Sequence, residues 1–366
     1  MTVAMRMPTE DRPILLIPGP TEVHPDVAAA GATPMIGHRG APSRALIQDV
    51  VESLQPWLGT SNPVLPLGCS ATGAMEASIR NLPAGRVLHL VNGAFAERWS
   101  TVRAACGREG DTVEASWGAP ILPGQVSEAL DRGEYVAVTM AHSETSTGVL
   151  NPLAEIASVV KQRPGVLLMV DAVTSMTAVP MQLDRWGVDL CFTGSQKALA
   201  LPPGLTLCTV SPRFVERARD VDGRGFYFDL PRHVDALAKW ETPTTPPISL
   251  LYQLQAALRR MEEEGRAQRF ARHVALRETV EAWAKDRFGF FAREGFRSPI
   301  LSVLRADAYD VAASLDAARA RGWWIGSGYG PTKADVIRIG HLGEIDVETL
   351  EKGLQTLDAC LVPRSS

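Results

Sequence analysis

Short apolar runs alternate with amphipathic stretches between residues 64 and 210. The apolar runs are residues 64–67, 87–91, 135–140, 166–170, 189–193 and 205–210. Between them apolar positions recur at helical spacing, as in residues 74–82 and 152–161. Strands that are apolar on both faces and alternate with helices are typical of a parallel sheet covered by helices on each side. The pattern therefore predicts an α/β fold with a mostly parallel sheet.

Two longer helices are predicted on either side of this region. In residues 43–58 apolar side chains recur every four positions, and Ser43 is the expected N-cap. The second helix follows an irregular, Pro- and Thr-rich stretch at residues 240–247. Its apolar stripe runs over residues 250–261, and the helix is expected to end near Gly265.

The regular alternation loosens beyond residue 265, which predicts a smaller α+β domain. Strands are expected at residues 300–304, 323–326 and 336–340, mixed with amphipathic helices, the last of which ends the chain. We expect a large domain over residues 13–265, with the first ~20 residues packing on the small domain, and a small domain over residues 266–361. The last residues read LVPRSS, so 362–366 resemble the remnant of a thrombin-cleavage site.

Composition narrows the class of protein. The 366 residues, of which 45% are hydrophobic and 21% charged, are typical of a globular protein of about two domains. A net charge of −4 gives no basic excess, so no nucleic-acid partner is expected. The apolar runs are far shorter than the ~20 residues that span a bilayer, so no membrane association is expected either.

Cysteine usage and the N-terminus indicate a cytoplasmic protein. The five cysteines are odd in number and never form a CxxC pair, so neither disulfides nor a metal site is expected. The first 13 residues contain no apolar segment typical of a secretory signal.

Asp171 and Lys197 are the first candidates for chemistry. Each follows a predicted strand, and the carboxyl ends of strands are where open α/β sheets bind ligands. A buried lysine can form a Schiff base with an aldehyde cofactor, and a carboxylate can pair with the pyridine nitrogen of pyridoxal phosphate. Taken singly, a surface lysine and a helix-capping aspartate explain the two residues more simply.

Three further segments carry candidate ligands. The small-residue turn GCSATGAMEA (68–77) links a strand to a helix and could bind a phosphate, although an ordinary tight turn would look the same. No GxGxxG motif follows a strand here, which disfavours a dinucleotide site. Thr145, in HSETSTG, offers a hydroxyl to a ligand or to a local turn. Arg338 interrupts an apolar strand, so it needs a partner, either a substrate carboxylate or an internal acid.

Nine motifs in order resemble fold-type-I pyridoxal-phosphate enzymes, and more narrowly class V aminotransferases of the alanine–glyoxylate, serine–pyruvate and serine–glyoxylate branch. The resemblance covers nearly the whole chain and implies a seven-stranded sheet of that fold. The motifs are IPGPT, GHR, SATGAMEA, NGAFAER, HSETSTG, VDAVTS, GSQKAL with PPGL, TPTTPP and GYGPTKADVIRIGHLG.

The resemblance implies a role for each matching residue around the cofactor. Lys197 would bind pyridoxal phosphate covalently and move the proton between substrate carbons, and Asp171 would pair with the pyridine nitrogen. Val173 would pack on one ring face, and Phe95 on the other, where relatives usually carry Trp or Tyr. The remaining cofactor and substrate contacts are implied for Ser70, Ala71, Thr72 and Gln196 at the phosphate, Thr145 at the phenolic oxygen, Arg338 at the substrate carboxylate and the backbone of Gly19 closing over it.

The TPTTPP segment implies a homodimer with shared active sites. Thr245 would contact the phosphate bound by the partner subunit. Some relatives carry Tyr three residues earlier, where this chain has Thr242. His38, Arg39 and Tyr227 have no assigned role, and the two residues of the GHR motif are either near the site entrance or simply solvated.

The expected activity is a ping-pong transfer of the amino group of a small L-amino acid (alanine, serine or aspartate) to a 2-oxo acid such as glyoxylate or pyruvate. One alternative is a lyase or cysteine desulfurase of the same class, which would need a His before the lysine and a reactive Cys in the small domain. Here Gln196 precedes Lys197, and Cys360 lies in the expected terminal helix. A non-catalytic homologue is the other alternative, although Lys197, Asp171 and Arg338 are all present.

Overall fold

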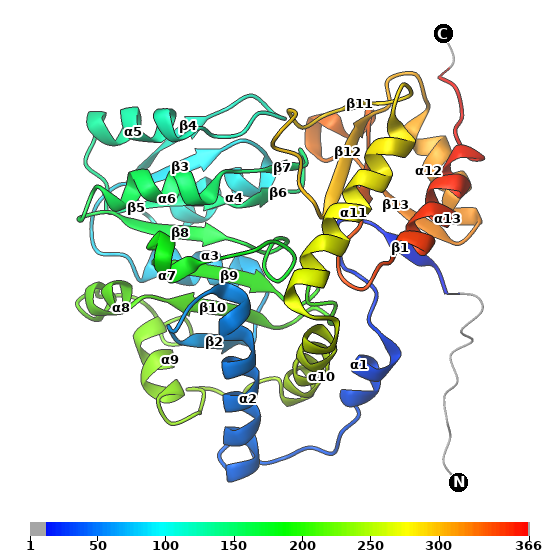
Figure 1. Ribbon diagram of the computed structural model, residues 1–366. Helices are drawn as coiled ribbons and strands as arrows, with labels where there is room; N and C mark the ends of the chain where they lie inside the picture. The colour runs from blue at the N-terminus through cyan, green and yellow to red at the C-terminus, as the bar shows by residue number, and fades with distance from the viewer. Residues whose placement is uncertain (1–11, 365–366) are drawn as a thin grey trace.

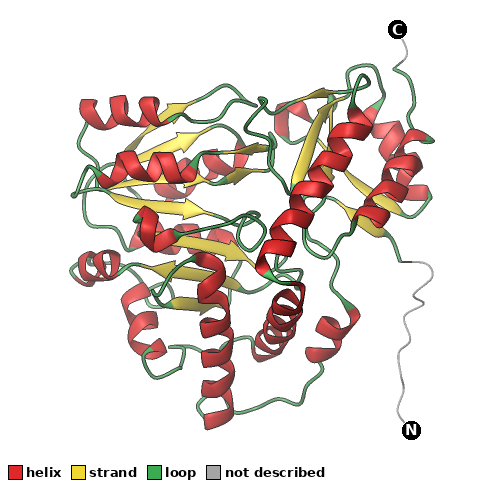
Figure 2. Cartoon of the chain, in the orientation of Figure 1, coloured by secondary structure: helices red, strands yellow, loops and turns green. Residues whose placement is uncertain are grey.

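The computed structural model describes residues 12–364 of the chain. Two sheets and a short two-stranded ribbon are surrounded by helices (Figures 1 and 2). The strands are β1 (Ile14–Leu16), β2 (Val64–Leu67), β3 (Val87–Val91), β4 (Gly110–Glu114), β5 (Ala137–Ala141), β6 (Ser143–Glu144), β7 (Val149–Leu150), β8 (Leu167–Asp171), β9 (Leu190–Gly194), β10 (Thr206–Val210), β11 (Gly289–Phe290), β12 (Leu301–Arg305), β13 (Trp323–Ser327) and β14 (Val336–Gly340). The helices are α1 (Pro25–Ala30), α2 (Ala41–Leu58), α3 (Ala71–Arg80), α4 (Ala94–Ala105), α5 (Pro123–Arg132), α6 (Leu153–Lys161), α7 (Leu183–Trp186), α8 (Pro212–Arg219), α9 (Leu230–Leu237), α10 (Ile248–Glu264), α11 (Arg266–Ala284), α12 (Val311–Ala320), α13 (Val347–Asp358) and a 3₁₀ turn (Gly330–Thr332).

The large sheet confirms the predicted α/β fold. Its seven strands lie in the order β2-β10-β9-β8-β5-β3-β4, and only β10 runs antiparallel to its neighbours. Every residue of β5, β8, β9 and β10 is buried, which is why these strands appear in the sequence as unbroken apolar runs. The edge strand β4 was not predicted, because its residues are mostly polar and only partly buried.

The long helices follow the predicted pattern, with one correction at an end. Helix α10 closes at Gly265, as expected. Helix α2 begins at Ala41 with Gly40 as its N-cap, so the expected cap at Ser43 is wrong. Pro42 occupies the first turn, where its fixed φ and missing N–H suit a helix start. Ser43 lies inside the helix, and its hydroxyl donates to the Gly40 carbonyl oxygen over 3.1 Å.

The small sheet has five strands in the order β1-β13-β14-β12-β11. Strand β1, from the beginning of the described chain, pairs in parallel with β13, and the other pairs are antiparallel. Helices α11, α12 and α13 pack with this sheet around a core separate from that of the large sheet. The division of the chain into two domains at residue 265 stays a prediction. The interpretation of residues 362–366 as the remnant of a cleavage site also stays a prediction, and residues 365 and 366 lie outside the described residues.

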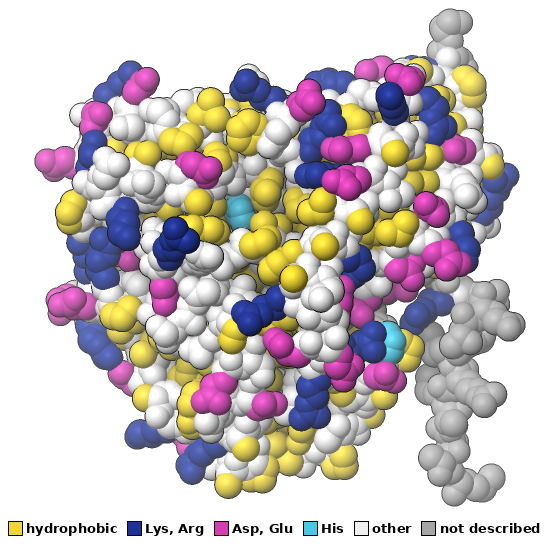
Figure 3. Space-filling view, in the orientation of Figure 1, with side chains coloured by type: hydrophobic (Ala, Val, Ile, Leu, Met, Phe, Trp, Pro, Cys, Tyr) yellow, Lys and Arg dark blue, Asp and Glu magenta, His cyan; other side chains and the backbone are white. Residues whose placement is uncertain are grey.

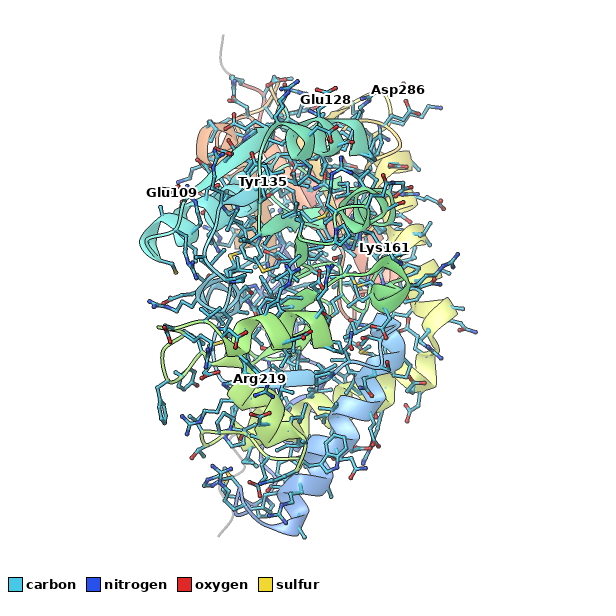
Figure 4. All side chains as sticks on the ribbon, turned by 90° about the vertical axis from the view of Figure 1, so that its left-hand side faces the viewer. Glu109, Glu128, Tyr135, Lys161, Arg219 and Asp286 are labelled. Carbon is cyan, nitrogen blue, oxygen red and sulfur yellow. The ribbon has the colours of Figure 1, made fainter. Side chains whose placement is uncertain are left out.

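The carboxyl ends of the parallel strands point toward the small sheet (Figure 1). Glu109 lies just before the start of β4, and Tyr135 lies just before the start of β5. Both residues mark the opposite side of the large sheet, where the parallel strands begin (Figure 4). Any site built at the carboxyl ends therefore lies between the two sheets. Positive and negative side chains are interspersed over the face drawn in Figure 3. Within residues 12–364 no helix is both long and apolar enough to cross a bilayer.

Candidate active site

Asp171 and Lys197 line one cavity of about 160 Å³ at the carboxyl ends of the neighbouring strands β8 and β9. This juxtaposition follows from the fold, because parallel strands end at the same edge of a sheet. The cavity is lined by Ser70, Ala71, Thr72, Met75, Phe95, Arg98, Ser143, Thr145, Asp171, Val173, Thr174, Gln196 and Lys197. Nine of the twelve residues predicted for the site are therefore brought together, and Gly19, Arg338 and Thr245 lie outside this lining.

Asp171 is a buried carboxylate without a cationic partner. It is 6% exposed, and its Oδ1 accepts a hydrogen bond of 2.8 Å from the backbone N–H of Val173. Within residues 12–364 no Lys, Arg or His forms an ion pair with it. Burial raises the pKa of Asp171 to about 7, although Arg98 and Lys197 act in the opposite direction. A cationic ring nitrogen placed beside this carboxylate would favour its ionised form.

Lys197 is held by a segment from the N-terminal part of the chain. Its Nζ donates to the carbonyl oxygen of Pro18, and its own carbonyl oxygen accepts from the Thr21 hydroxyl over 3.0 Å. Burial, together with the nearby Arg338 guanidinium, lowers the pKa of Lys197 to about 8. Gly19 has φ +122°, and a Cβ there would lie 2.6 Å from both Cδ and Nζ of Lys197. Only glycine fits this close approach to the lysine.

The N-terminus of α3 forms a cradle for an anion. Ser70 is the N-cap residue, and its side chain makes no capping hydrogen bond. The amides of Ala71 and Thr72 belong to the first turn, where N–H groups have no acceptor within the helix. Gln196 lines the same cavity. Free donors at the positive end of a helix dipole suit a phosphate group.

Phe95 forms an aromatic wall of the cavity. Phe95, in the first turn of α4, has its ring centroid 5.5 Å from that of Tyr329, which lies beyond β13. The guanidinium of Arg98, one turn further along α4, lies 4.8 Å from the centre of the Phe95 ring. Val173 lines the same cavity from the loop after β8.

Arg338 reaches the site from the small sheet. It lies in the middle of β14, where its Nε donates to the Ser327 carbonyl oxygen over 2.6 Å. Its Nη1 donates to the Thr145 carbonyl oxygen over 3.2 Å. In the described part of the chain no carboxylate oxygen lies within 4 Å of the Arg338 guanidinium, although the charge of Glu144 acts to raise the pKa of Arg338 against the lowering by burial. The guanidinium is therefore still able to pair with an acid.

Thr245 does not line the cavity of its own chain and is exposed. Thr242 is buried, and its hydroxyl donates to the Thr244 carbonyl oxygen over 2.7 Å, so it is occupied within the loop. Arg39 donates to the Thr242 carbonyl oxygen over 2.6 Å and holds this loop. The Tyr227 hydroxyl donates to the Gly68 carbonyl oxygen over 3.0 Å, just before the anion cradle.

Four cavity residues were not predicted from the sequence: Met75, Arg98, Ser143 and Thr174. Glu144, which does not line the cavity but accepts hydrogen bonds from the start of α4, was not predicted either. All five lie inside or next to motifs of the resemblance, but a motif does not show which of its side chains point inward. Arg98 could have been found from its helical spacing of three residues from Phe95.

A model of the family described as "Aminotransferase class-V" matches residues 33–287. The chain belongs to the class-V aminotransferase family. It is 36% identical to the "Soluble hydrogenase, small subunit" of Synechococcus sp., over 96% of this chain and 94% of that one. It is 30% identical to the L-aspartate–glyoxylate aminotransferase of Paracoccus denitrificans, over 96% and 91% of the two chains. Among solved structures, alanine–glyoxylate aminotransferase from Nostoc sp. superposes with a TM-score of 0.89 at 30% identity, covering 95% of each chain.

The desulfurase-like alternative is not favoured. Cys360 lies two residues beyond the end of α13 rather than inside the terminal helix as expected, and it is buried and does not line the cavity. Burial also removes the solvent access that a reactive thiolate needs.

Proposed function

We propose that this protein is a pyridoxal-phosphate-dependent aminotransferase that moves the amino group of a small L-amino acid to a 2-oxo acid. The proposal depends above all on one observation: a partly buried lysine amine with a lowered pKa and a buried carboxylate without a cationic partner face the same small cavity. The family of the chain and the names of its relatives support the same activity.

The cavity fits pyridoxal phosphate at three points. The α3 N-terminus with Ser70, Thr72 and Gln196 offers donors to a phosphate, Asp171 offers a carboxylate to a ring nitrogen, and Lys197 offers an amine to an aldehyde. Phe95 and Val173 line the same cavity and would supply apolar faces to a planar ring, and Thr145, also in the lining, would contact the phenolic oxygen. When bound, the cofactor would accept the electron pair that remains on the substrate's Cα after its proton is removed.

Each protein group then has a distinct task. Arg338 binds the α-carboxylate of the substrate, with the backbone at Gly19 closing over it, and so fixes the Cα position. Lys197 would take the Cα proton on its Nζ and deliver it to the cofactor carbon that carried the aldehyde, because a pKa of about 8 lets the amine act in either direction near neutral pH. Asp171, as a carboxylate, keeps a proton on the ring nitrogen.

The donor is drawn from alanine, serine and aspartate, and the acceptor from glyoxylate and pyruvate. Relatives named for aspartate and for alanine, each with glyoxylate, lie at the same 30% identity, so similarity does not choose between the two donors. We further propose a cytoplasmic homodimer in which Thr245 serves the partner's phosphate site, because Thr245 is exposed and away from its own cavity.

The test is the visible absorbance of the purified protein loaded with pyridoxal phosphate, recorded while L-alanine, L-serine and L-aspartate are added in turn. We expect a yellow band that fades with one donor. Lys197→Ala should lose the band and turnover, whereas Lys161→Ala, at the exposed end of α6 (Figure 4), should keep both. Near-normal turnover in Lys197→Ala, or a wild-type protein that stays colourless with the cofactor, would refute the proposal.

A further inference from the structure

Glu144 is a fully buried carboxylate that the proposed chemistry does not use. It lies in β6 at 0% exposure, in the loop region that also carries Thr145. Its Oε2 accepts hydrogen bonds from the backbone N–H groups of Phe95 (3.1 Å) and Ala96 (2.8 Å). Its Oε1 accepts from the Ser146 N–H (3.0 Å) and the Ser146 hydroxyl (2.6 Å). Because all four hydrogen bonds come from donors, they suit a carboxylate that carries its negative charge.

The acceptors on this loop replace a missing helix cap. Helix α4 has Gly93 at its N-cap position, so no side chain of its own can accept from the first-turn amides. Instead the Ser146 hydroxyl accepts from the Ala94 N–H over 3.0 Å, and Glu144 accepts from the next two. The first three amides of α4 are thus satisfied by a segment about 50 residues away in the chain. A carboxylate at this end of a helix is also favoured by the helix dipole.

Gly93 is required for this contact. Its φ of 167° is ordinary extended backbone, so glycine is not needed for conformation. A Cβ at Gly93 would, however, lie 2.4 Å from Cγ of Glu144 and 2.5 Å from the Ser146 hydroxyl oxygen. Any larger residue would push the Glu144 carboxylate off the amides.

The contact links three parts of the candidate site. Phe95, whose own amide is bound by Glu144, forms one wall of the cavity. Thr145 is the next residue after Glu144, and its carbonyl oxygen accepts from Arg338. The loop that carries Glu144 and Thr145 therefore contacts both Phe95 and Arg338, and so helps to fix the positions of both residues.

We propose that Glu144 is a positioning residue, which fixes Phe95 against the plane of the cofactor and so sets the cofactor's affinity and orientation. The inference rests on the proposed function, because it concerns how the same cavity holds pyridoxal phosphate. Glu144 does not line the cavity and acts through the amides of α4. Burial raises the pKa of Glu144 above its usual value, and the hydrogen bonds from Ser146, Ala96 and Phe95 offset only part of that rise.

Two variants disturb this contact in different ways. Glu144→Gln keeps the shape but turns one acceptor into an NH₂ group that faces donors. Gly93→Ala keeps the carboxylate and displaces it. The matched control is Glu97→Gln, which removes a charge from the first turn of the same helix at an exposed position. Each protein is stripped of cofactor, checked for folding by far-ultraviolet circular dichroism, and titrated with pyridoxal phosphate.

Both variants should bind pyridoxal phosphate about tenfold more weakly, the loss expected for a removed helix cap, and should change the circular dichroism of the bound cofactor's visible band. Glu97→Gln should match the wild type in both measurements. In a Phe95→Leu background Glu144→Gln should cause little further loss of affinity, because the effect passes through Phe95. This double-mutant comparison separates positioning from a general effect on folding.

The outcomes are distinguishable. Wild-type affinity and an unchanged visible band in both Glu144→Gln and Gly93→Ala would overturn the inference and leave the proposed function intact. An undiminished effect of Glu144→Gln in the Phe95→Leu background would also overturn it. Failure of the wild-type protein itself to bind the cofactor would overturn the proposed function and this inference with it. Should Glu144→Gln not fold, Gly93→Ala carries the same comparison.

Discussion

The guanidinium of Arg338 donates a hydrogen bond to the carbonyl oxygen of Thr145, so a strand of the small sheet is tied to the turn between β6 and β7. Strand β14 positions the arginine at this junction, with a second bond to the Ser327 carbonyl oxygen. Both acceptors are neutral carbonyls. Burial lowers the pKa of Arg338 and the charge of Glu144 acts the other way, but no carboxylate hydrogen-bonds the guanidinium among the described residues, so its N–H groups can bind an incoming carboxylate.

Replacing Arg338 by Lys should weaken substrate binding while leaving the cofactor in place. Lysine keeps the charge but loses the planar pair of N–H groups that binds a carboxylate through two hydrogen bonds. We expect KM for the amino acid to rise about 10- to 100-fold, with a smaller change in kcat. Steady-state kinetics with the donor identified by absorbance measure this split.

The control for Arg338→Lys is Arg305→Lys, on the neighbouring strand β12, where the side chain is exposed. It should leave KM unchanged. An Arg338→Lys enzyme with wild-type KM would show that the substrate carboxylate binds elsewhere.

Without cofactor, the Asp171→Asn protein should be more stable than the wild type, and the difference should grow as the pH rises. The pKa of Asp171 is raised from 3.8 to about 7 in the folded chain, so folding favours the protonated acid. Stability is then lost between about pH 4 and pH 7, because ionisation of the folded protein lags behind that of the unfolded chain. At about 1.36 kcal/mol per pKa unit, the full effect is on the order of 4 kcal/mol.

Urea denaturation of cofactor-free wild type and Asp171→Asn at pH 4 and pH 8 measures this effect. The advantage of the variant should be larger at pH 8, although the variant should have lost turnover. Equal differences at both pH values would mean that Asp171 does not titrate in this range.

The pattern of the sequence predicted the parts of the site that depend on strands. Asp171 and Lys197 each follow a continuous apolar run, and such runs end at one edge of a parallel sheet. Arg338 stood out because an arginine within an apolar strand demands a partner. Which partner it has could not be predicted, because that depends on where β14 lies relative to Thr145, far away in the chain.

The contacts that position the site were not visible in the sequence. Glu144 lies among Ser and Thr residues that equally well form local turns, and nothing local shows that it caps a helix about 50 residues earlier. The half-exposed edge strand β4 lacks an apolar run, so its pattern does not differ from that of a loop. Ser43 was mistaken for a cap because capping preference is a local signal, whereas Pro42 fixes the start of α2 earlier.

Replacing Arg269 by Met should destabilise the protein and loosen the lysine loop. Arg269 is fully buried in α11 and donates to the carbonyl oxygens of Ala198 (2.6 Å) and Thr177 (3.2 Å). It also pairs with Glu264 at 2.9 Å. Methionine fills the space but leaves both carbonyl oxygens without their donor, so we expect a loss of about 3 kcal/mol in the free energy of unfolding.

The control for Arg269→Met is Arg266→Met, at the exposed start of the same helix, which should change the free energy of unfolding by no more than about 0.5 kcal/mol. Because Ala198 directly follows Lys197, Arg269→Met should also release bound pyridoxal phosphate faster on dialysis. A variant as stable as the control would show that the buried arginine is not needed to hold the loop.

Thr245 tests whether two chains share each active site. It is exposed and lies outside the cavity of its own chain, so a contact with phosphate requires a second chain. Thr245→Ala should weaken cofactor binding by about tenfold through loss of one hydrogen bond to a charged group. Lys197→Ala should abolish turnover by itself.

Mixed dimers of these two variants distinguish the shared from the separate arrangement. If Thr245 serves the partner, a dimer of one Lys197→Ala chain and one Thr245→Ala chain contains one site with both wild-type residues and one site with neither. The intact site should bind pyridoxal phosphate with wild-type affinity and give half of the wild-type turnover per dimer. If Thr245 serves its own chain, the only site with a lysine lacks the threonine, and its affinity equals that of the Thr245→Ala homodimer. Affinity-tagged heterodimers titrated with cofactor therefore decide between the two arrangements, because only the shared one restores a full set of contacts.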